Sequence, residues 1–198
     1  MRFAYADPPY IGQAKKHYSH DPNCAEVDHQ ALIDSLAEYD GWALSLSSPS
    51  LKTILPMCPE GARVGIWVKP FCAFKVNVNP AYAYEPVIFF GGRRRTRQQP
   101  TTRDWLSELQ LLRAAVAGKE TAKALRMVDS LIQAEQKDVV SHVITLKKGL
   151  SGAKPEAFCE WVLDWLNVEG GDEVVDIFPG TGVMGLVAAR RTGLEVAA

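Results

Sequence analysis

Short apolar runs alternate with helical patterns along most of the chain. Runs rich in β-branched and aromatic residues predict buried strands. These runs occupy residues 1–6, 42–47, 63–69, 84–90 and 139–146, and a sixth begins at Val174. Helical patterns lie between them, at 29–39, from residue 48, around 158–166 and after the glycine-rich turn at 180–185. Strands that alternate with short helices predict an α/β domain whose parallel or mixed sheet is covered on both faces.

Local signals predict helix starts and buried faces. Asp28 is expected to be the N-cap of the first helix, and Pro49 suits the first turn of the second. The inward side chains of that second helix are predicted to be Leu51, Ile54, Leu55 and Met57. The later aromatic helix is expected to pack into the core rather than stack on bases, because one face holds its large residues. These are Phe158, Trp161, Val162, Trp165 and Leu166.

The pattern changes between residues 104 and 138. Two runs of apolar residues at helical spacing lie on either side of Gly118. They predict a helical hairpin inserted into a single domain that spans residues 1–198. Two interpretations stay open for it: a structural appendage, or an element for target recognition or oligomerisation.

Composition narrows the class of protein. The 198 residues suffice for one well-buried domain, and 47% are hydrophobic. The net charge of −1 means that any DNA contact must rely on a local basic patch. There is no apolar run of about 18 residues, no pattern of a signal peptide and no Cys-x-x-Cys pair. We therefore expect no membrane association and a cytoplasmic location.

The loop at 11–27 is long for a connection within a compact domain, which is typical of functional loops. It carries Lys15 and Lys16, which could contact nucleic acid. His17, His20, Cys24 and His29 offer a zinc alternative, but their spacing matches no compact structural zinc pattern. No metal is therefore predicted.

A glycine-rich turn follows the strand at Val174. Gly180-Thr-Gly-Val-Met-Gly185 lets the backbone approach a ligand and opens a helix whose N-terminal N–H groups suit anionic atoms. The pattern alone fits NAD, FAD or S-adenosylmethionine. A dinucleotide fold places this turn first, with an acid about 20 residues later. Here the turn lies near the end of the sequence, which disfavours a dinucleotide.

The first strand runs into Asp7-Pro8-Pro9-Tyr10. The prolines end the strand and present a carboxylate and an aromatic ring at its C-terminal edge. The Asp7 carboxylate and the Pro8 carbonyl could each accept one N–H of an exocyclic amine, and Tyr10 could stack on a flipped base. The alternative is a Pro-Pro turn in which Asp7 only caps the backbone.

Taken together, the two motifs resemble those of the DNA amino-methyltransferases that modify adenine N6 or cytosine N4. The signatures of that family are (D/N/S)-P-P-(Y/F/W) and D-x-F-x-G-x-G, which stand here at 7–10 and 176–182. Their order, catalytic motif first, resembles the circularly permuted β group. Gly-Trp-Ala-Leu-Ser at 41–45 and Gly-Ala-Lys-Pro at 152–155 are similar to DNA methylases encoded by bacterial viruses.

This resemblance implies a Rossmann-like S-adenosylmethionine-dependent methyltransferase sheet, circularly permuted, with DNA as partner. It implies that Asp7, Pro8, Pro9 and Tyr10 hold the target amine and base. The residues that it implies for the cofactor are Lys154, Pro155, Asp176, Phe178, Gly180, Thr181 and Gly182. The Asp form of the first motif favours adenine over cytosine. A bacterial or virus-infected cell is the implied setting, and an oligomer could form through the insertion.

Two departures from the family leave a rival interpretation open. The acid that holds the cofactor ribose would follow a further strand, and Glu195 lies too early to replace it. A large target-recognition domain is also missing. The chain could therefore be a non-catalytic nucleic-acid-binding remnant. A basic cluster after Gly91-Gly92 is predicted to contact phosphates. Its members are Arg93, Arg94, Arg95 and Arg97.

Overall fold

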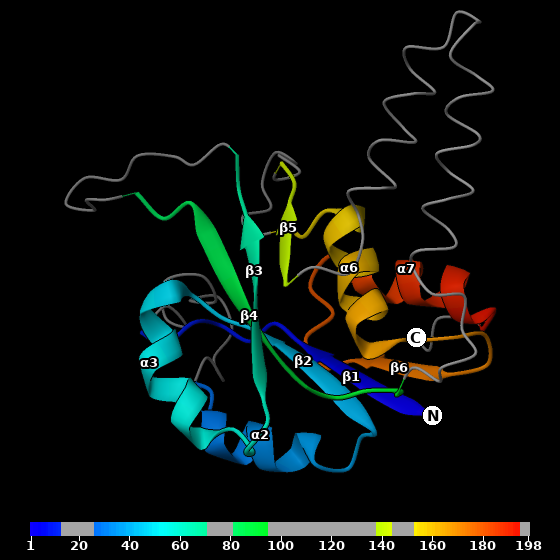
Figure 1. The fold of residues 1–198 in the computed structure, drawn as a ribbon, viewed down its shortest axis with the longest axis horizontal. Helices are drawn as coiled ribbons and strands as arrows, with labels where there is room; N and C mark the ends of the chain where they lie inside the picture. The colour runs from blue at the N-terminus through cyan, green and yellow to red at the C-terminus, as the bar shows by residue number, and fades with distance from the viewer. Residues whose placement is uncertain (13–25, 71–80, 95–137, 144–152, 195–198) are drawn as a thin grey trace, which may run out of the picture. The chain divides into compact units, whose positions relative to one another are not determined.

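A single mixed sheet organises the computed structural model, which describes residues 1–12, 26–70, 81–94, 138–143 and 153–194 (Figure 1). Six strands lie in the order β5-β3-β4-β2-β1-β6. They are β1 (Arg2–Ala6), β2 (Gly41–Ser45), β3 (Arg63–Val68), β4 (Tyr84–Gly91), β5 (Val139–Ser141) and β6 (Glu173–Asp176). The α-helices are α2 (His29–Leu36), α3 (Leu51–Ile54), α6 (Glu156–Leu166) and α7 (Val183–Thr192), and the 3₁₀ turns η1 (Ser48–Ser50) and η2 (Leu55–Met57) flank α3.

Strand direction divides the sheet. β1 is parallel to both of its neighbours, β2 and β6, and β5 is parallel to β3. β4 is antiparallel to β2 and to β3. The predicted mixed α/β sheet is therefore confirmed, and β4 is the strand that makes it mixed.

Each face of the sheet carries its own core, and β1 contributes to both because its side chains alternate. Phe3 and Tyr5 pack with α6 and α7, whereas Ala4 and Ala6 pack with α2 and α3. Figure 1 shows these helix pairs on opposite sides of the sheet. The covering of both faces, predicted from the alternation of elements, is confirmed.

The aromatic face of α6 lies in the core, as predicted. Phe158 is fully buried and Trp161 is 7% exposed. Phe89 of β4 stacks on Trp165 with ring centroids 4.3 Å apart. Stacked aromatic pairs at this separation stabilise a core beyond their buried area alone. These rings are occupied within the protein and are not a platform for bases.

Helix starts and faces match the sequence in part. The Asp28 carboxylate accepts a hydrogen bond from the Ala31 backbone N–H at 3.0 Å, which confirms the predicted N-cap. Ile54 is buried as predicted, but the prediction for Leu55 is wrong, because its side chain is 37% exposed. The helix changes to a 3₁₀ turn at Leu55, so the period falls from 3.6 to 3.0 residues and moves this side chain off the apolar face.

Several predictions fall outside the described residues. The helical insertion at about 104–138 lies there except for Asp138, and so does the predicted end of the strand at 144–146. Within the described part of the chain, no helix is long and apolar enough to cross a membrane.

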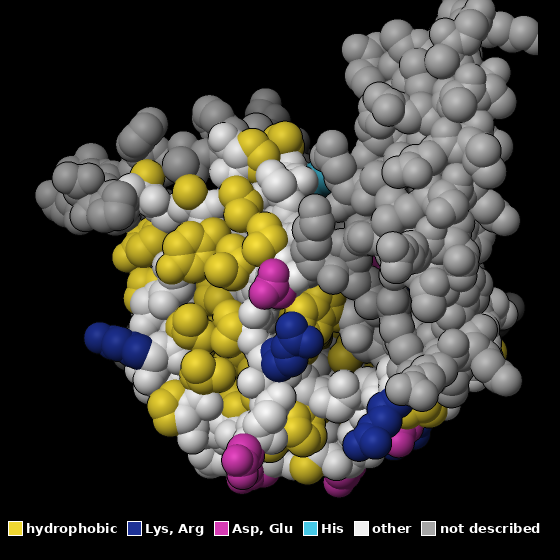
Figure 2. Space-filling model, in the orientation of Figure 1, with side chains coloured by type: hydrophobic (Ala, Val, Ile, Leu, Met, Phe, Trp, Pro, Cys, Tyr) yellow, Lys and Arg dark blue, Asp and Glu magenta, His cyan; other side chains and the backbone are white. Residues whose placement is uncertain are grey.

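Figure 2 shows hydrophobic side chains gathered over α3 and β4. Exposed large hydrophobic residues at or next to these elements are Leu55 at the start of η2, Tyr82 just before β4, and Tyr84 in β4.

Candidate functional site

The sheet brings the two sequence motifs together. β1 and β6 are neighbouring parallel strands, with Tyr5 in register with Asp176, so both strands end at the same edge. The Ile177 backbone N–H also donates to the Tyr5 carbonyl at 2.9 Å. The chain continues from β1 to α2 on one face and from β6 to α7 on the other. In open α/β sheets such a divergence forms the crevice in which ligands bind.

A buried charge cluster surrounds the Asp-Pro-Pro-Tyr motif. The ammonium Nζ of Lys154, a side chain that is 9% exposed, lies 2.8 Å from Asp7 Oδ2 and 3.4 Å from Glu85 Oε2. Glu85 also accepts the Tyr10 hydroxyl hydrogen bond at 3.0 Å and pairs with Lys69. Two carboxylates and two ammonium groups therefore compensate one another within a few ångströms.

Burial and pairing act in opposite directions on the ionisation of this cluster. Burial raises the pKa of Asp7, and the Lys154 ammonium limits that rise. Burial opposes the charge on Lys154, but Asp7, Tyr5 and Glu85 outweigh it and raise the Lys154 pKa. Burial likewise opposes ionisation of Glu85, and the two lysines overcome it and lower its pKa. Pairing therefore favours the ionised forms of Lys154 and Glu85, whereas burial still dominates at Asp7.

The carboxylate at the end of β6 has one oxygen without a partner. Asp176 Oδ1 is buried and has no hydrogen-bond partner among the described residues. Burial and the charge of Asp7 raise the Asp176 pKa, and the hydrogen bond from the Phe178 backbone N–H opposes them, so that the pKa is about 6. A buried carboxylate oxygen without a partner is costly, so the site favours a donor or cation supplied by a ligand.

The glycine turn that follows is shaped for close approach. Gly180 has φ +49° and Gly182 has φ +73°, both in the left-handed region that glycine adopts without strain. A Cβ at Gly182 would meet no atom within 4 Å. Gly182 is the N-cap of α7 and contributes no side chain to the first N–H groups of the helix. Those N–H groups and the space above the turn suit the polar end of a ligand.

The remaining predicted residues divide between this edge and other places. Pro8, Lys154 and Pro155 are buried, Pro9 is partly buried, and Phe178 packs beside the core that α2 covers. Thr181 is exposed in the glycine turn. The Lys154 ammonium pairs with Asp7 and Glu85, so its ion pairs among the described residues lie beside the Asp-Pro-Pro-Tyr motif and not at the glycine turn.

Arg93 does not join the site. β4 is antiparallel to β2, so Gly91 pairs with Gly41 at the edge where β2 begins. The Arg93 guanidinium there donates to both oxygens of Asp172 at 2.6 Å. Burial and this pairing act on Asp172 in opposite directions, and the pairing lowers its pKa to about 2. Arg94 is exposed, and Lys15, Lys16, Arg95 and Arg97 lie outside the described residues, as do His17, His20 and Cys24 of the zinc alternative.

Sequence reasoning missed two members of the cluster, Glu85 and Lys69. The signal for Glu85 was present, because a carboxylate interrupts the apolar run of β4 and needs a partner when buried. Lys69 follows β3 directly, and antiparallel pairing with β4 sets it beside Glu85. Neither partner could be assigned before the strand direction was known.

Comparison with known proteins gives structural likenesses only. No protein-family model matches the chain, and no curated protein matches it. The crystal structure of the M1.HpyAVI–SAM complex superimposes with a TM-score of 0.51 at 14% sequence identity, over 96% of this chain and 80% of that chain. Two structures of TTHA0409 from Thermus thermophilus, a protein assigned as a DNA modification methylase, also superimpose over 96% of this chain. The first gives a TM-score of 0.46 at 16% identity and covers 77% of its own chain. The second gives a TM-score of 0.47 at 17% identity and covers 78% of its own chain. At these identities, the likeness to M1.HpyAVI establishes a shared fold.

Proposed function

We propose that this protein is an S-adenosylmethionine-dependent DNA methyltransferase that acts on an exocyclic amine, with adenine N6 as the target. One observation carries the proposal: Asp7 and Asp176, 169 positions apart in the sequence, follow and end two adjacent parallel strands at one edge. A target-amine motif and a cofactor motif must meet in this way for direct methyl transfer. The fold shared with M1.HpyAVI, which was crystallised with SAM, supports the same conclusion.

The residues at the end of β6 fit the proposed cofactor. S-adenosylmethionine carries an ammonium and a carboxylate on its methionine part and supplies an electrophilic methyl on a positively charged sulfur. The unpaired Asp176 Oδ1 would accept from the ammonium, which would relieve the cost of its burial. The backbone N–H groups from Gly180 to the start of α7 suit the carboxylate. Phe178 and Thr181 would border the same pocket.

The residues after β1 would prepare the amine. Asp7 and the Pro8 carbonyl would each accept one N–H, which keeps the nitrogen lone pair out of the base ring. Tyr10 would stack on the flipped base, and Pro9 would keep the turn rigid. With the cofactor supplying an electrophilic methyl group, Asp7 and Pro8 would direct the nitrogen lone pair of the amine towards it, and the Asp7 carboxylate could accept the proton that the amine loses. Positioning of amine and methyl accounts for most of the rate.

Finer features of the proposal follow from the sequence. The adjacency of an N-terminal and a C-terminal strand supports a circularly permuted β-group order. Asp in the first motif favours adenine over N4-cytosine. The basic residues Lys15, Lys16, Arg94, Arg95 and Arg97 remain proposed phosphate contacts. A virus-encoded origin, a cytoplasmic location and an oligomer formed through the insertion are proposed on the same resemblance.

Calorimetric titration of the protein with S-adenosylmethionine tests the cofactor half. We expect saturable binding that Asp176→Ala weakens by at least tenfold, with Asp138→Ala as a control at an exposed position. Absence of binding by the parent protein at millimolar cofactor would contradict the proposal and favour the non-catalytic remnant.

A further inference from the structure

We propose that Lys154 and Glu85 are positioning residues that hold the Asp7 carboxylate and the Tyr10 ring in one orientation for the incoming amine. Neither residue is assigned this role by the sequence resemblance, which implies a cofactor contact for Lys154. The inference rests on the proposed function and deepens it, because it names the groups that set the geometry of the target half of the site.

Lys154 contacts Asp7 through one of its two carboxylate oxygens. Lys154 holds Oδ2 at 2.8 Å, and Oδ1 has no hydrogen bond among the described residues. The Asp7 side chain is 23% exposed, so a ligand can reach it. One oxygen is therefore fixed by the protein while the other is available to accept an N–H. A carboxylate held at one oxygen loses rotational freedom, which preorganises it for the amine.

Glu85 pairs with the Lys154 ammonium. Its ammonium lies 3.4 Å from Glu85 Oε2, and the same oxygen accepts from the Tyr10 hydroxyl at 3.0 Å. Glu85 thus connects the lysine that fixes the carboxylate with the ring proposed to stack on the base. A change at Glu85 would alter both ends of the Asp-Pro-Pro-Tyr motif at once.

Three aromatic rings lie around the Lys154 ammonium. Lys154 Nζ lies 5.8 Å from the centroid of Trp67, 5.9 Å from that of Phe158 and 6.0 Å from that of Tyr10. Cations within about 6 Å of a ring face are attracted by its quadrupole. The rings leave the ammonium little access to water, so its charge acts on Asp7 and Glu85 at short range.

Charge reasoning predicts opposite effects for the two positioning residues. Charged and titratable groups act on or with Asp7 from several elements. They are Tyr5 in β1, Lys69 directly after β3, Glu85 in β4, Lys154 just before α6, Cys159 in α6 and Asp176 in β6. Lys154 lowers the Asp7 pKa and Glu85 raises it. Removing the lysine should therefore raise the Asp7 pKa, and neutralising Glu85 should lower it.

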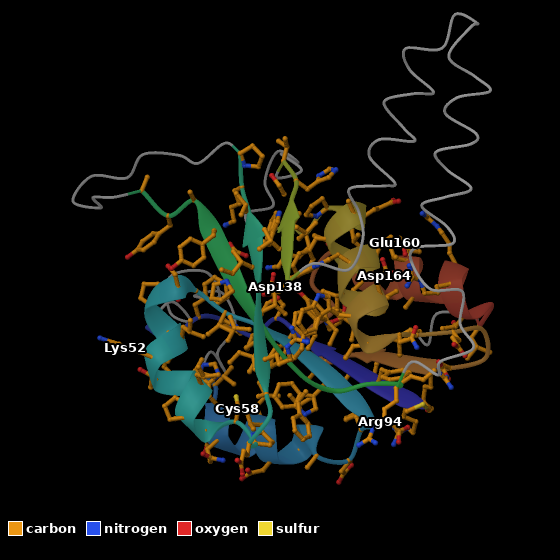
Figure 3. The ribbon with its side chains drawn as sticks, in the orientation of Figure 1. Lys52, Cys58, Arg94, Asp138, Glu160 and Asp164 are labelled. Atoms are coloured by element: carbon orange, nitrogen blue, oxygen red, sulfur yellow. The ribbon has the colours of Figure 1, made fainter. Side chains whose placement is uncertain are left out.

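Two variants and a matched control test the inference in the ligand-free protein. They are Lys154→Met, Glu85→Gln and Lys52→Met, the last at an exposed lysine of α3 that points away from the molecule (Figure 3). The Asp7 carboxyl signal is followed by carbon NMR across pH and identified by its loss in Asp7→Asn. We expect Lys154→Met to raise the Asp7 pKa by about one pH unit or more, Glu85→Gln to lower it, and Lys52→Met to leave it unchanged.

The same variants are then assayed for methyl transfer to DNA across pH. In Lys154→Met the acid limb of kcat should move to higher pH with the Asp7 titration, while KM for S-adenosylmethionine stays within about twofold. If Lys154→Met does not fold, Glu85→Gln still gives the opposite displacement. An unchanged Asp7 titration in either folded variant, or a large rise in cofactor KM without that displacement, would overturn the inference. Absence of methyl transfer by the parent protein would overturn the proposed function instead, and the NMR titration distinguishes the two failures.

Discussion

Replacing Asp176 by Asn should make the ligand-free protein more stable while it weakens cofactor binding. The carboxylate has a buried oxygen without a partner among the described residues, and burial raises its pKa to about 6 from an ordinary 3.8. A difference of about two pH units corresponds to about 3 kcal/mol of cost for the ionised form. Because Asp176 is only partly buried, screening by water reduces the expected gain to about 1–2 kcal/mol.

The sign of the pH dependence follows from the raised pKa. The folded protein binds the Asp176 proton more tightly than the unfolded chain, so the penalty is absent below about pH 4. It grows as pH rises and is complete above about pH 6. Asp176→Asn should therefore raise Tm at pH 8 by about 2–8 °C and change it little at pH 4.

Thermal unfolding followed by circular dichroism measures this effect, with and without S-adenosylmethionine. The matched control is Asp138→Asn, an exposed aspartate immediately before β5 (Figure 3). The parent protein should gain Tm on adding the cofactor, and Asp176→Asn should gain much less. Equal stability of parent and variant at pH 8, or an undiminished response to the cofactor, would refute the reasoning about this carboxylate.

Three further substitutions test the account elsewhere. Arg93→Ala should lower Tm, because it removes one of the three partners of Asp172, the others being the Met1 ammonium and the Glu169 backbone N–H. It should leave the salt dependence of DNA binding unchanged in gel-shift titrations, and a flatter slope would support the predicted phosphate contact. Gly65→Ala should lower the free energy of unfolding in urea by about 1–3 kcal/mol, because the new Cβ would lie 2.9 Å from the Trp161 ring. The control Gly170→Ala should change that free energy little, because its Cβ would meet no atom within 4 Å. Burial lowers the pKa of His29, so the stability of the folded protein should fall as pH drops below about 6.5. His29→Leu should lessen that fall, and identical stability profiles of the parent protein and the variant across pH would contradict the expectation.

The sequence predicted the elements well because their signals are local. The Asp28 cap, the aromatic face of α6 and the apolar runs of the strands depend on neighbours within a few residues. Leu55 is an exception for a local reason, since the change to a 3₁₀ turn interrupts a period that the apolar pattern assumes to be constant.

The non-local features could not be obtained in this way. The direction of β4 decides that Arg93 lies at the far edge from Asp7, and strand direction is a property of the whole sheet. The partnership of Glu85 with Lys154 likewise joins residues 69 positions apart. The adjacency of β1 and β6 is also non-local, and only the resemblance of the two motifs to one family anticipated it.

The most direct test of the central claim is the chemical identity of the product. The protein is incubated with DNA and with S-adenosylmethionine that carries an isotope-labelled methyl group, and the DNA is digested to nucleosides for mass spectrometry. We predict labelled N6-methyldeoxyadenosine with the parent protein and none with Asp7→Ala, which leaves the glycine turn intact. Label in N4-methyldeoxycytidine would correct the target base. DNA without label, or equal label with Asp7→Ala, would contradict the account.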